Sequence, residues 1–175
     1  MFHLTDWVHA CERPGTMTGA MTGPAAATRA DREFLAEAIA LAHRCPPSRT
    51  AFSVGALIVA DDGVVLGRGW SRRHDLTEHA EEAALADVAA ADRRRLRAAT
   101  IYSSLEPCGR RLSREVTCTE HILAVGIPRV VFAWSEPSLF VEAQGADLLR
   151  RAGREVIQVA ELADAAHEPN LHLLR

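Results

Sequence analysis

Apolar residues spaced three and four positions apart predict the first helix of the chain. After Thr28 the apolar positions are Phe34, Leu35, Ala38, Ile39 and Ala42, which share one helix face. Thr28 or Asp31 has the side chain that an N-cap requires. The helix must end near Cys45, because two prolines follow that residue and disfavour a helical conformation before them.

Shorter apolar runs predict five strands, at residues 54–59, 64–69, 99–104, 129–134 and 155–159. The first two flank Asp61-Asp62-Gly63 and form a hairpin. Three further helices are expected between the later strands, at residues 79–91, 119–125 and 142–152. Thr77 or Glu78 can cap the start of the first, and Gly126 and Gly153 end the other two. Because strands joined through helices need crossover connections, the later strands should pair in parallel. The pattern predicts an α/β fold, a three-layer α/β/α domain on a five-stranded mixed sheet.

The two ends of the chain differ from this pattern. Residues 1–28 are rich in Gly, Thr, Ala, Met and Pro without a steady period, and we expect a loosely ordered arm or one that packs on a partner subunit. The folded domain should span residues 29–175. Its last part, residues 162–175, is a helix candidate interrupted at Pro169.

Composition limits the class of protein. The chain has 175 residues, 48% of them hydrophobic, and a formal net charge of -3, which fits one domain with a sizeable core. It has no apolar run of membrane-spanning length and no secretory signal pattern, so we expect a cytoplasmic protein. In that compartment the four cysteines should be reduced thiols or metal ligands. The mildly acidic balance makes nucleic acid an unlikely main partner.

Candidate chemistry lies between residues 79 and 118. The sequence His79-Ala80-Glu81 opens an alanine-rich helical run, Pro107-Cys108 follows the third strand, and Cys118 precedes another helix. One imidazole, two thiols and an unpaired carboxylate match a catalytic zinc site with three protein ligands, a fourth position for water, and a base. His74 and His121 are rival ligands.

The spacing of His79 and Glu81 restricts where they can act together. Residues two apart on a regular helix point about 200° away from each other, so both can face one metal only at an irregular helix start. There Glu81 would take a proton from water and deliver it to a ring nitrogen and a departing amine. Taken singly, His79 is as typical of a helix end and Glu81 of a solvated acid, while Cys11 and Cys45 are typical of small buried residues.

These motifs resemble the cytidine deaminase-like superfamily, most closely the deaminase domain of the bifunctional riboflavin-biosynthesis deaminase/reductase. The matching segments are Phe52-Ser53-Val54-Gly55-Ala56, His79-Ala80-Glu81, Ser104-Leu105-Glu106-Pro107-Cys108 and Gly126-Ile127-Pro128-Arg129-Val130-Val131. The resemblance implies zinc (Zn2+) on His79, Cys108 and Cys118, with Glu81 as proton shuttle, and a homodimer or homotetramer. The ten positions between the two cysteines depart from the short Pro-Cys-x-x-Cys of other members and look like a variant of the long loop in the riboflavin group. Thr50-Ala51-Phe52 replaces the Pro-Asn-Pro segment of that group.

Substrate recognition is less specified than the metal site. Candidate binding residues are Phe52, Gly55, Ala80, Arg110, Arg111 and Arg114. The three arginines could bind the 5′-phosphate of a nucleotide-like substrate, or they could be solvated charges or subunit contacts. Gly55 indicates either a close backbone approach, to a ligand or to the zinc-site helix, or a β-bulge.

The function expected from these residues is hydrolytic deamination of an amino-pyrimidine or a related amino-heterocycle, as base, nucleoside or nucleotide, with release of ammonia. A riboflavin-pathway-like aminopyrimidine phosphate is one such substrate. The alternatives are a non-catalytic zinc-stabilised binding module and an RNA base deaminase. Glu81 argues against the first, because a closed structural zinc site has no use for an extra carboxylate. The second requires a basic channel.

Overall fold

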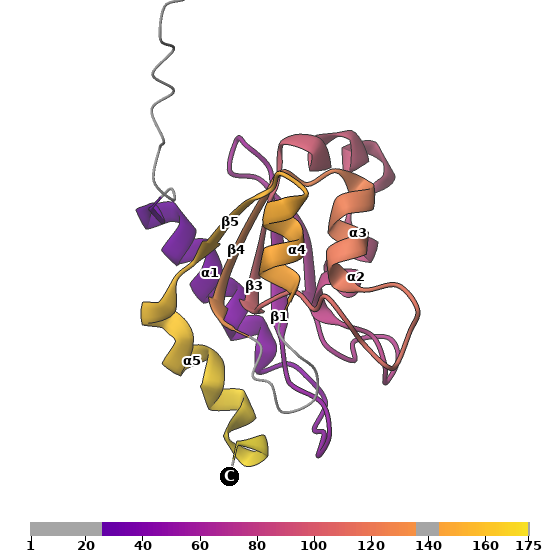
Figure 1. Ribbon diagram of the computed structural model, residues 1–175, viewed down its shortest axis with the longest axis vertical. Coiled ribbons are helices and arrows are strands. Elements are labelled where there is room, and N and C mark those ends of the chain that lie inside the picture. Colours follow the sequence, from indigo (N-terminus) through magenta and orange to yellow (C-terminus); the bar gives the residue numbers. More distant parts are fainter. Residues whose placement is uncertain (1–25, 136–143, 175) are drawn as a thin grey trace, which may run out of the picture.

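A computed structural model describes residues 26–135 and 144–174 of the chain (Figure 1). Its centre is a five-stranded sheet in the order β2-β1-β3-β4-β5. The strands are β1 (Gly55–Val59), β2 (Val65–Trp70), β3 (Thr100–Leu105), β4 (Arg129–Trp134) and β5 (Glu155–Gln158). Strand β1 pairs antiparallel with β2 and β3, whereas β3, β4 and β5 pair in parallel. The predicted mixed sheet is confirmed.

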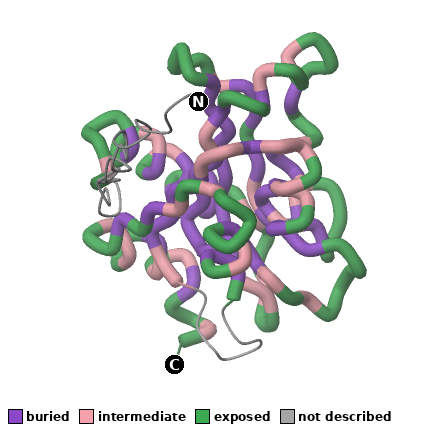
Figure 2. The backbone as a smooth tube through the Cα atoms, turned by 45° about the horizontal axis from the view of Figure 1, so that its top comes forward, coloured by how far each residue is buried: buried purple, intermediate pink, exposed green. Residues whose placement is uncertain are grey.

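Helices cover both faces of this sheet. They are α1 (Arg29–Ala42), α2 (Ala80–Asp87), α3 (Cys118–Val125), α4 (Gly145–Arg151) and α5 (Ala163–His167), with 3-10 helices at Ala90–Ala98, Ala160–Leu162 and Glu168–Leu173. Side chains of α1 and α5 share one apolar core with the sheet, and those of α2, α3 and α4 share the other. The buried segments therefore lie in the middle of the molecule and the exposed ones at its periphery (Figure 2). The predicted α/β/α layering is confirmed.

The ends of several elements follow the expected local chemistry. Thr28 caps α1 by accepting a hydrogen bond from the Asp31 backbone N–H. Gly126, with φ of 81°, ends α3 in the left-handed conformation that glycine adopts readily. The predicted N-terminal arm lies almost wholly outside the described residues, as does the start of the helix predicted at 142–152. Within the described ranges, no helix combines the length and apolar character needed to cross a membrane.

The predicted length of the second helix was wrong. Instead of running to residue 91, α2 ends at Asp87, and a 3-10 helix follows that holds the arginine run of residues 93–97. Val88 adopts an extended conformation and is buried with Leu96 in the same core. Burial of these two side chains therefore overrides the local preference of the alanine-rich segment for a longer helix.

Close backbone contacts fix two helices on the sheet. A Cβ atom at Gly55 would lie 2.0 Å from the Ala38 carbonyl oxygen of α1, so Gly55 is a site of close approach, to α1 rather than to the zinc-site helix. The irregular register of β1 lies instead at Ile58 and Val59. Helix α2, which begins after His79, approaches β2, where a Cβ at Gly69 would lie 2.2 Å from the Ala80 carbonyl oxygen. The start of α2 is therefore set directly by the sheet.

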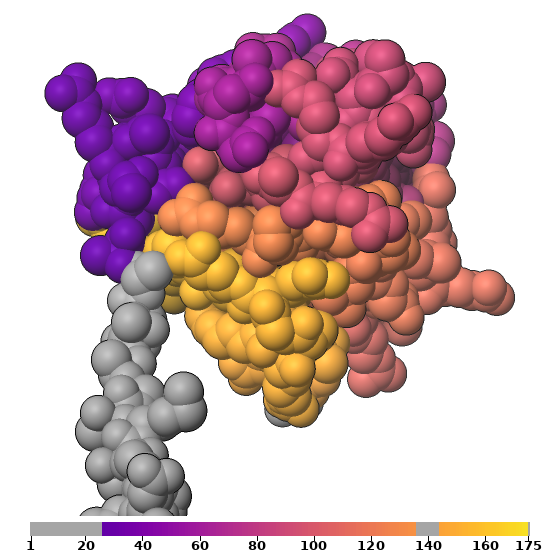
Figure 3. All heavy atoms as spheres, turned by 90° about the horizontal axis from the view of Figure 1, so that it is seen from above, coloured from indigo at the N-terminus to yellow at the C-terminus, as the bar shows by residue number. Residues whose placement is uncertain are grey.

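The C-terminal segment, yellow in Figure 3, lies beside the indigo start of the described chain. It consists of short helices with Pro169 in the first turn of the last one, in line with the predicted interruption. The buried Asn170 amide donates to the Ser53 carbonyl at 2.9 Å and accepts from the Ser53 N–H at 2.7 Å. Arg32 of α1 pairs with Glu161 at 2.8 Å. The C-terminal segment is thereby joined both to α1 and to the segment that precedes β1.

Candidate active site

Hydrogen bonds hold the segments of the two cysteines together. Cys108 follows the end of β3 by three positions, and Cys118 is the first residue of α3, after the N-cap Thr117. The Cys118 N–H donates to the Cys108 Sγ at 3.4 Å, and the Thr119 N–H donates to the Cys108 carbonyl at 3.2 Å. These bonds join the two cysteines directly, although a long loop separates them in sequence.

His79 provides the third side chain of the cluster. It is the N-cap of α2, in an extended conformation, so the predicted caps Thr77 and Glu78 were wrong. The irregular helix start that His79 and Glu81 require is present. The His79 Nδ1 atom lies 3.6 Å from the Cys108 Sγ and 3.3 Å from the Cys118 Sγ. The rival ligand His74 instead bonds Glu78 at 2.9 Å, and His121 lies 3.6 Å from Glu82.

The donor atoms of His79, Cys108 and Cys118 fit a zinc ion. All three lie within 4.8 Å of one another. Bond lengths to tetrahedral zinc place two of its ligand atoms about 3.5–3.8 Å apart, close to the separations found here. The hydrogen bond with Cys118 lowers the pKa of Cys108, and contact with Cys108 raises the pKa of Cys118. A cation is therefore needed to hold both sulfurs as thiolates, the form that binds metals.

The Glu81 carboxylate lies against this cluster. The residue is 3% exposed; its Oε1 accepts a hydrogen bond from the Ser103 hydroxyl at 2.9 Å, and its Oε2 lies 3.3 Å from the Cys118 Sγ. Burial raises the pKa of the Glu81 carboxyl, against the opposing effect of His79. The side chain can thus take up and release a proton beside the three donors.

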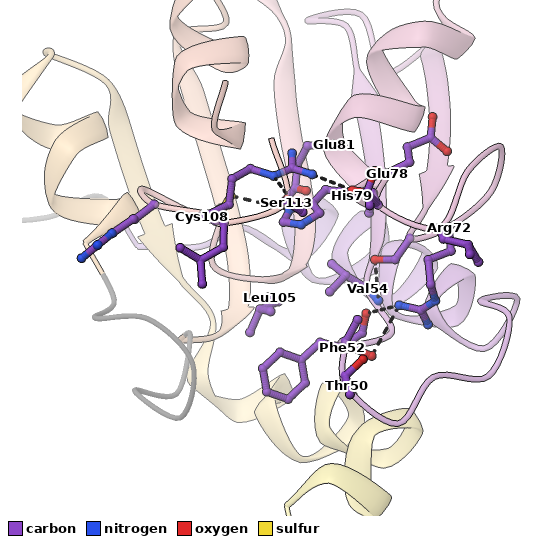
Figure 4. Close-up of a pocket in the computed structure, with 18 of the residues that line it drawn as sticks. Thr50, Phe52, Val54, Arg72, Glu78, His79, Glu81, Leu105, Cys108 and Ser113 are labelled. Atoms are coloured by element: carbon purple, nitrogen blue, oxygen red, sulfur yellow. Dashed lines mark hydrogen bonds between the residues drawn. The ribbon is translucent and has the colours of Figure 1, made fainter. Parts of the chain in front are cut away.

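A cavity of about 420 Å³ opens onto the cluster (Figure 4). His79, Glu81 and Cys108 lie at one end of it, and Phe52 and Leu105 form an apolar wall nearby. Of the predicted substrate residues, Phe52, Ala80, Arg110 and Arg111 line the cavity. Gly55 and Arg114 are not among its lining residues: Gly55 packs on α1, and Arg114 forms an ion pair with Asp75.

The three arginines of the inter-cysteine loop have different surroundings. The guanidinium of Arg111 is buried and donates to Glu82 at 2.7 Å and to the Thr77 carbonyl at 2.6 Å. Arg114 reaches Asp75 and the Thr77 hydroxyl. Arg110 is exposed, and within the described part of the chain it makes no hydrogen bond or ion pair. Arg110 is therefore the arginine of this loop with a guanidinium free to meet a ligand in the cavity.

Sequence reasoning missed Arg72, which shapes the cavity wall. This residue has a positive φ of 64° and is buried. Its guanidinium donates to the carbonyls of Pro46 and Phe52, each at 2.8 Å, and so clamps the segment that precedes β1. No sequence signal distinguishes it, because a pair of arginines after a strand is typical of a solvated surface.

Comparison with known proteins identifies the family. Residues 28–134 match the family model described as the cytidine and deoxycytidylate deaminase zinc-binding region. The chain belongs to this deaminase family. The match includes His79, Glu81, Cys108 and Cys118, the residues that the fold brings together.

Relatives within the deaminase family point to one branch of it. The chain is 38% identical, over 75% of its length, to diaminohydroxyphosphoribosylamino-pyrimidine deaminase of Schizosaccharomyces pombe, and 33% identical, over 80%, to the riboflavin biosynthesis protein RibD of Aquifex aeolicus. It covers 33% and 37% of those proteins, about a third of their length.

Solved structures of the same branch share the fold. RibD of Acinetobacter baumannii superimposes with a TM-score of 0.71 at 30% identity, covering 83% of this chain and 39% of that one. The Rib2 deaminase of Aspergillus oryzae, a C-terminal deletion mutant, superimposes with a TM-score of 0.70 at 25% identity, covering 82% of this chain and 91% of that one. The deaminase-family domain described above therefore corresponds to nearly all of the Aspergillus deletion mutant.

Proposed function

We propose that this chain is a hydrolytic deaminase that binds zinc through His79, Cys108 and Cys118. The observation that carries the proposal is the buried Glu81 carboxylate, 3.3 Å from a sulfur of the cluster and facing the same cavity. A zinc ion bound by these three residues supplies a Lewis acid that lowers the pKa of water toward neutrality.

Glu81 moves the protons of the reaction. Its carboxylate takes a proton from the water that attacks the ring carbon, and returns it to the ring nitrogen next to that carbon. It then carries the second proton of the water to the amino group, so that the carbon–nitrogen bond breaks, ammonia leaves and a carbonyl remains. The Ser103 hydroxyl holds the Glu81 carboxylate toward the cavity. Burial of Glu81 supports this role because it raises the pKa of a group that must carry a proton.

The cavity supports an aminopyrimidine with a phosphorylated side group as the substrate. Its volume of about 420 Å³ lies in the range typical of small-molecule sites. Phe52 and Leu105 offer an apolar surface for a flat ring, and the free guanidinium of Arg110 suits a phosphate. The Schizosaccharomyces relative is named for a substrate of this chemistry, a diaminohydroxyphosphoribosylaminopyrimidine.

We also propose that the chain acts as a homodimer or homotetramer. Leu76 and Leu112 line the cavity and are 82% and 86% exposed. Large apolar side chains this exposed at the rim of a site favour coverage by another protein surface. Light scattering coupled to size-exclusion chromatography measures the assembly directly, and a monomer at micromolar concentration contradicts this part of the proposal.

A substrate panel tests the proposed activity. The panel compares free amino-pyrimidines, their nucleosides, their nucleotides and phosphoribosylaminopyrimidines, with ammonia release as the readout. We expect the phosphorylated aminopyrimidine to be turned over fastest, and a chelator to abolish the reaction until zinc is restored. No ammonia from any member of the panel by the zinc-loaded chain would overturn the proposed function.

A further inference from the structure

The loop of residues 109–117 joins the two cysteines of the cluster and runs over the surface. Residues 112–116 of this loop are exposed, but the side chain of Arg111 is 3% exposed. Its guanidinium reaches back to the start of α2, where Nη1 donates to the Glu82 Oε2 at 2.7 Å and Nη2 to the Thr77 carbonyl at 2.6 Å. The loop is thereby tied to the other segment that contributes to the cluster.

One oxygen atom connects this ion pair to His79. The Glu82 Oε2 that accepts from Arg111 also accepts from the backbone N–H of His79 at 2.9 Å. His79 is the N-cap of α2, where backbone N–H groups have no acceptor within the helix. The Glu82 carboxylate is the acceptor for the His79 N–H. The position of the His79 backbone therefore depends on a carboxylate that Arg111 holds.

We propose that Arg111 is a positioning residue for the zinc site, an inference that rests on the proposed function. Through Glu82, its guanidinium keeps the backbone of His79 in register with the two sulfurs, which belong to a separate segment. Each of its three nitrogens already donates to Ser113, Glu82 or Thr77, and its side chain is 3% exposed, so we assign phosphate binding to another group. The nearly buried Glu82 would lose its shortest ion pair without Arg111, because Arg114 and His121 lie 3.5 Å and 3.6 Å away.

The physical consequence is a change in metal retention. Groups that do not bind the metal but orient its ligands through hydrogen bonds contribute about 10–100-fold to metal affinity. Arg111→Gln leaves a nearly buried carboxylate without its main partner, and that carboxylate can then turn away from the His79 N–H. Arg111→Lys keeps a charge near Glu82, but an ammonium lacks the planar fork that reaches Glu82 and the Thr77 carbonyl together.

The experiment measures the rate at which zinc passes from the loaded, full-length protein to a colorimetric chelator. The variants are Arg111→Gln, Arg111→Lys, Glu82→Gln and the Arg111→Gln/Glu82→Gln double variant. Arg93→Gln is the control, since it removes an exposed arginine of the 3-10 helix after α2 that is not among the cavity lining residues. The visible spectrum of cobalt(II)-substituted protein reports ligand geometry independently of activity, and circular dichroism confirms that each variant is folded.

We expect Arg111→Gln to release zinc about ten-fold faster than the parent, with Arg111→Lys in between and Arg93→Gln within about two-fold. The double variant should release zinc no faster than about the quicker single variant, because both substitutions break the same connection. Arg111→Gln should also leave the ratio of KM values for phosphorylated and dephosphorylated substrate unchanged.

A folded Arg111→Gln variant with parental zinc release and an unchanged cobalt spectrum overturns the positioning role. If Arg111→Gln does not fold, the zinc release rate and the cobalt spectrum of Glu82→Gln are used instead, with the same interpretation. If the parent binds zinc and releases ammonia, and these variants release zinc at the parental rate, only this inference is contradicted and the proposed function stands. A parent chain that takes up no zinc contradicts the proposed function, and this inference with it.

Discussion

The Ser103 hydroxyl donates a hydrogen bond to the Glu81 carboxylate at 2.9 Å, and both side chains are buried. Ser103 belongs to β3, so the sheet itself orients the proposed proton carrier. Glu81 projects from the first turn of α2, and the bond thereby joins a helix to the strand beneath it.

Loss of the Ser103 hydroxyl should lower turnover. We expect Ser103→Ala to reduce kcat about ten-fold, because a hydrogen bond to a charged group contributes about 1.5 kcal/mol and its loss frees the carboxylate to rotate. Steady-state ammonia release at matched zinc content measures the effect. Ser104→Ala is the control, since that hydroxyl accepts from the Gly55 N–H and does not touch Glu81. A kcat for Ser103→Ala equal to that of the control would show that Glu81 needs no such support.

Arg110 should govern the affinity for phosphorylated substrates. Removing its exposed guanidinium by Arg110→Gln should raise KM about ten-fold for a phosphorylated aminopyrimidine at unchanged kcat, since a contact made equally in ground and transition states affects binding alone. KM for the dephosphorylated analogue should stay within about two-fold. Arg93→Gln, an exposed arginine of the 3-10 helix after α2, is the control. Equal KM changes for both substrates would rule out phosphate contact.

A buried ion pair away from the site should dominate acid stability. Asp31 accepts from Arg129 at 2.6 Å and from the Tyr102 hydroxyl at 2.9 Å. Burial acts to raise the pKa of Asp31, but the hydrogen bonds from Arg129, Thr28 and Tyr102 prevail and hold it well below its usual range. Because the folded-state pKa is lowered, the stabilisation is complete above the unfolded value of about 4 and is lost as the pH falls below it toward the folded pKa.

Urea unfolding between pH 7 and pH 2 measures this contribution. Asp31→Asn should lower the free energy of unfolding at pH 7 by roughly 3 kcal/mol, since it leaves Arg129 without its buried partner. Its stability should then fall less steeply than that of the parent below pH 4. Parallel pH profiles for the two proteins would mean that Asp31 does not contribute through its charge.

The clustering of His79, Cys108 and Cys118 could be predicted because zinc chemistry restricts both the type and the position of its ligands. His79-Ala80-Glu81 is the one His-x-Glu in the sequence and opens a predicted helix, and Cys108 and Cys118 lie near the ends of predicted elements. Gly126 was likewise identifiable, because a helix that ends in the left-handed conformation requires such a residue. Sequence patterns were sufficient for side chains whose position depends on the local backbone, such as those at helix ends.

Groups that depend on long-range packing could not be predicted. Ser103 faces Glu81 only because of the register of β3 beneath α2, and Arg111 meets Glu82 only because of the path of a long loop. Val88 ends α2 because its side chain is buried in a core that the local sequence does not reveal. In each case the deciding partner is contributed by tertiary structure.

The central claim is that Glu81 moves protons at a zinc site formed by His79, Cys108 and Cys118. Its most direct test is the zinc content and ammonia release of the parent and of Glu81→Gln, measured on the same preparations with a phosphorylated aminopyrimidine. We predict about one zinc per chain in both proteins, and a rate at least about 100-fold lower in Glu81→Gln. Equal rates in the two proteins, or a parent chain that releases ammonia without zinc, would contradict the account.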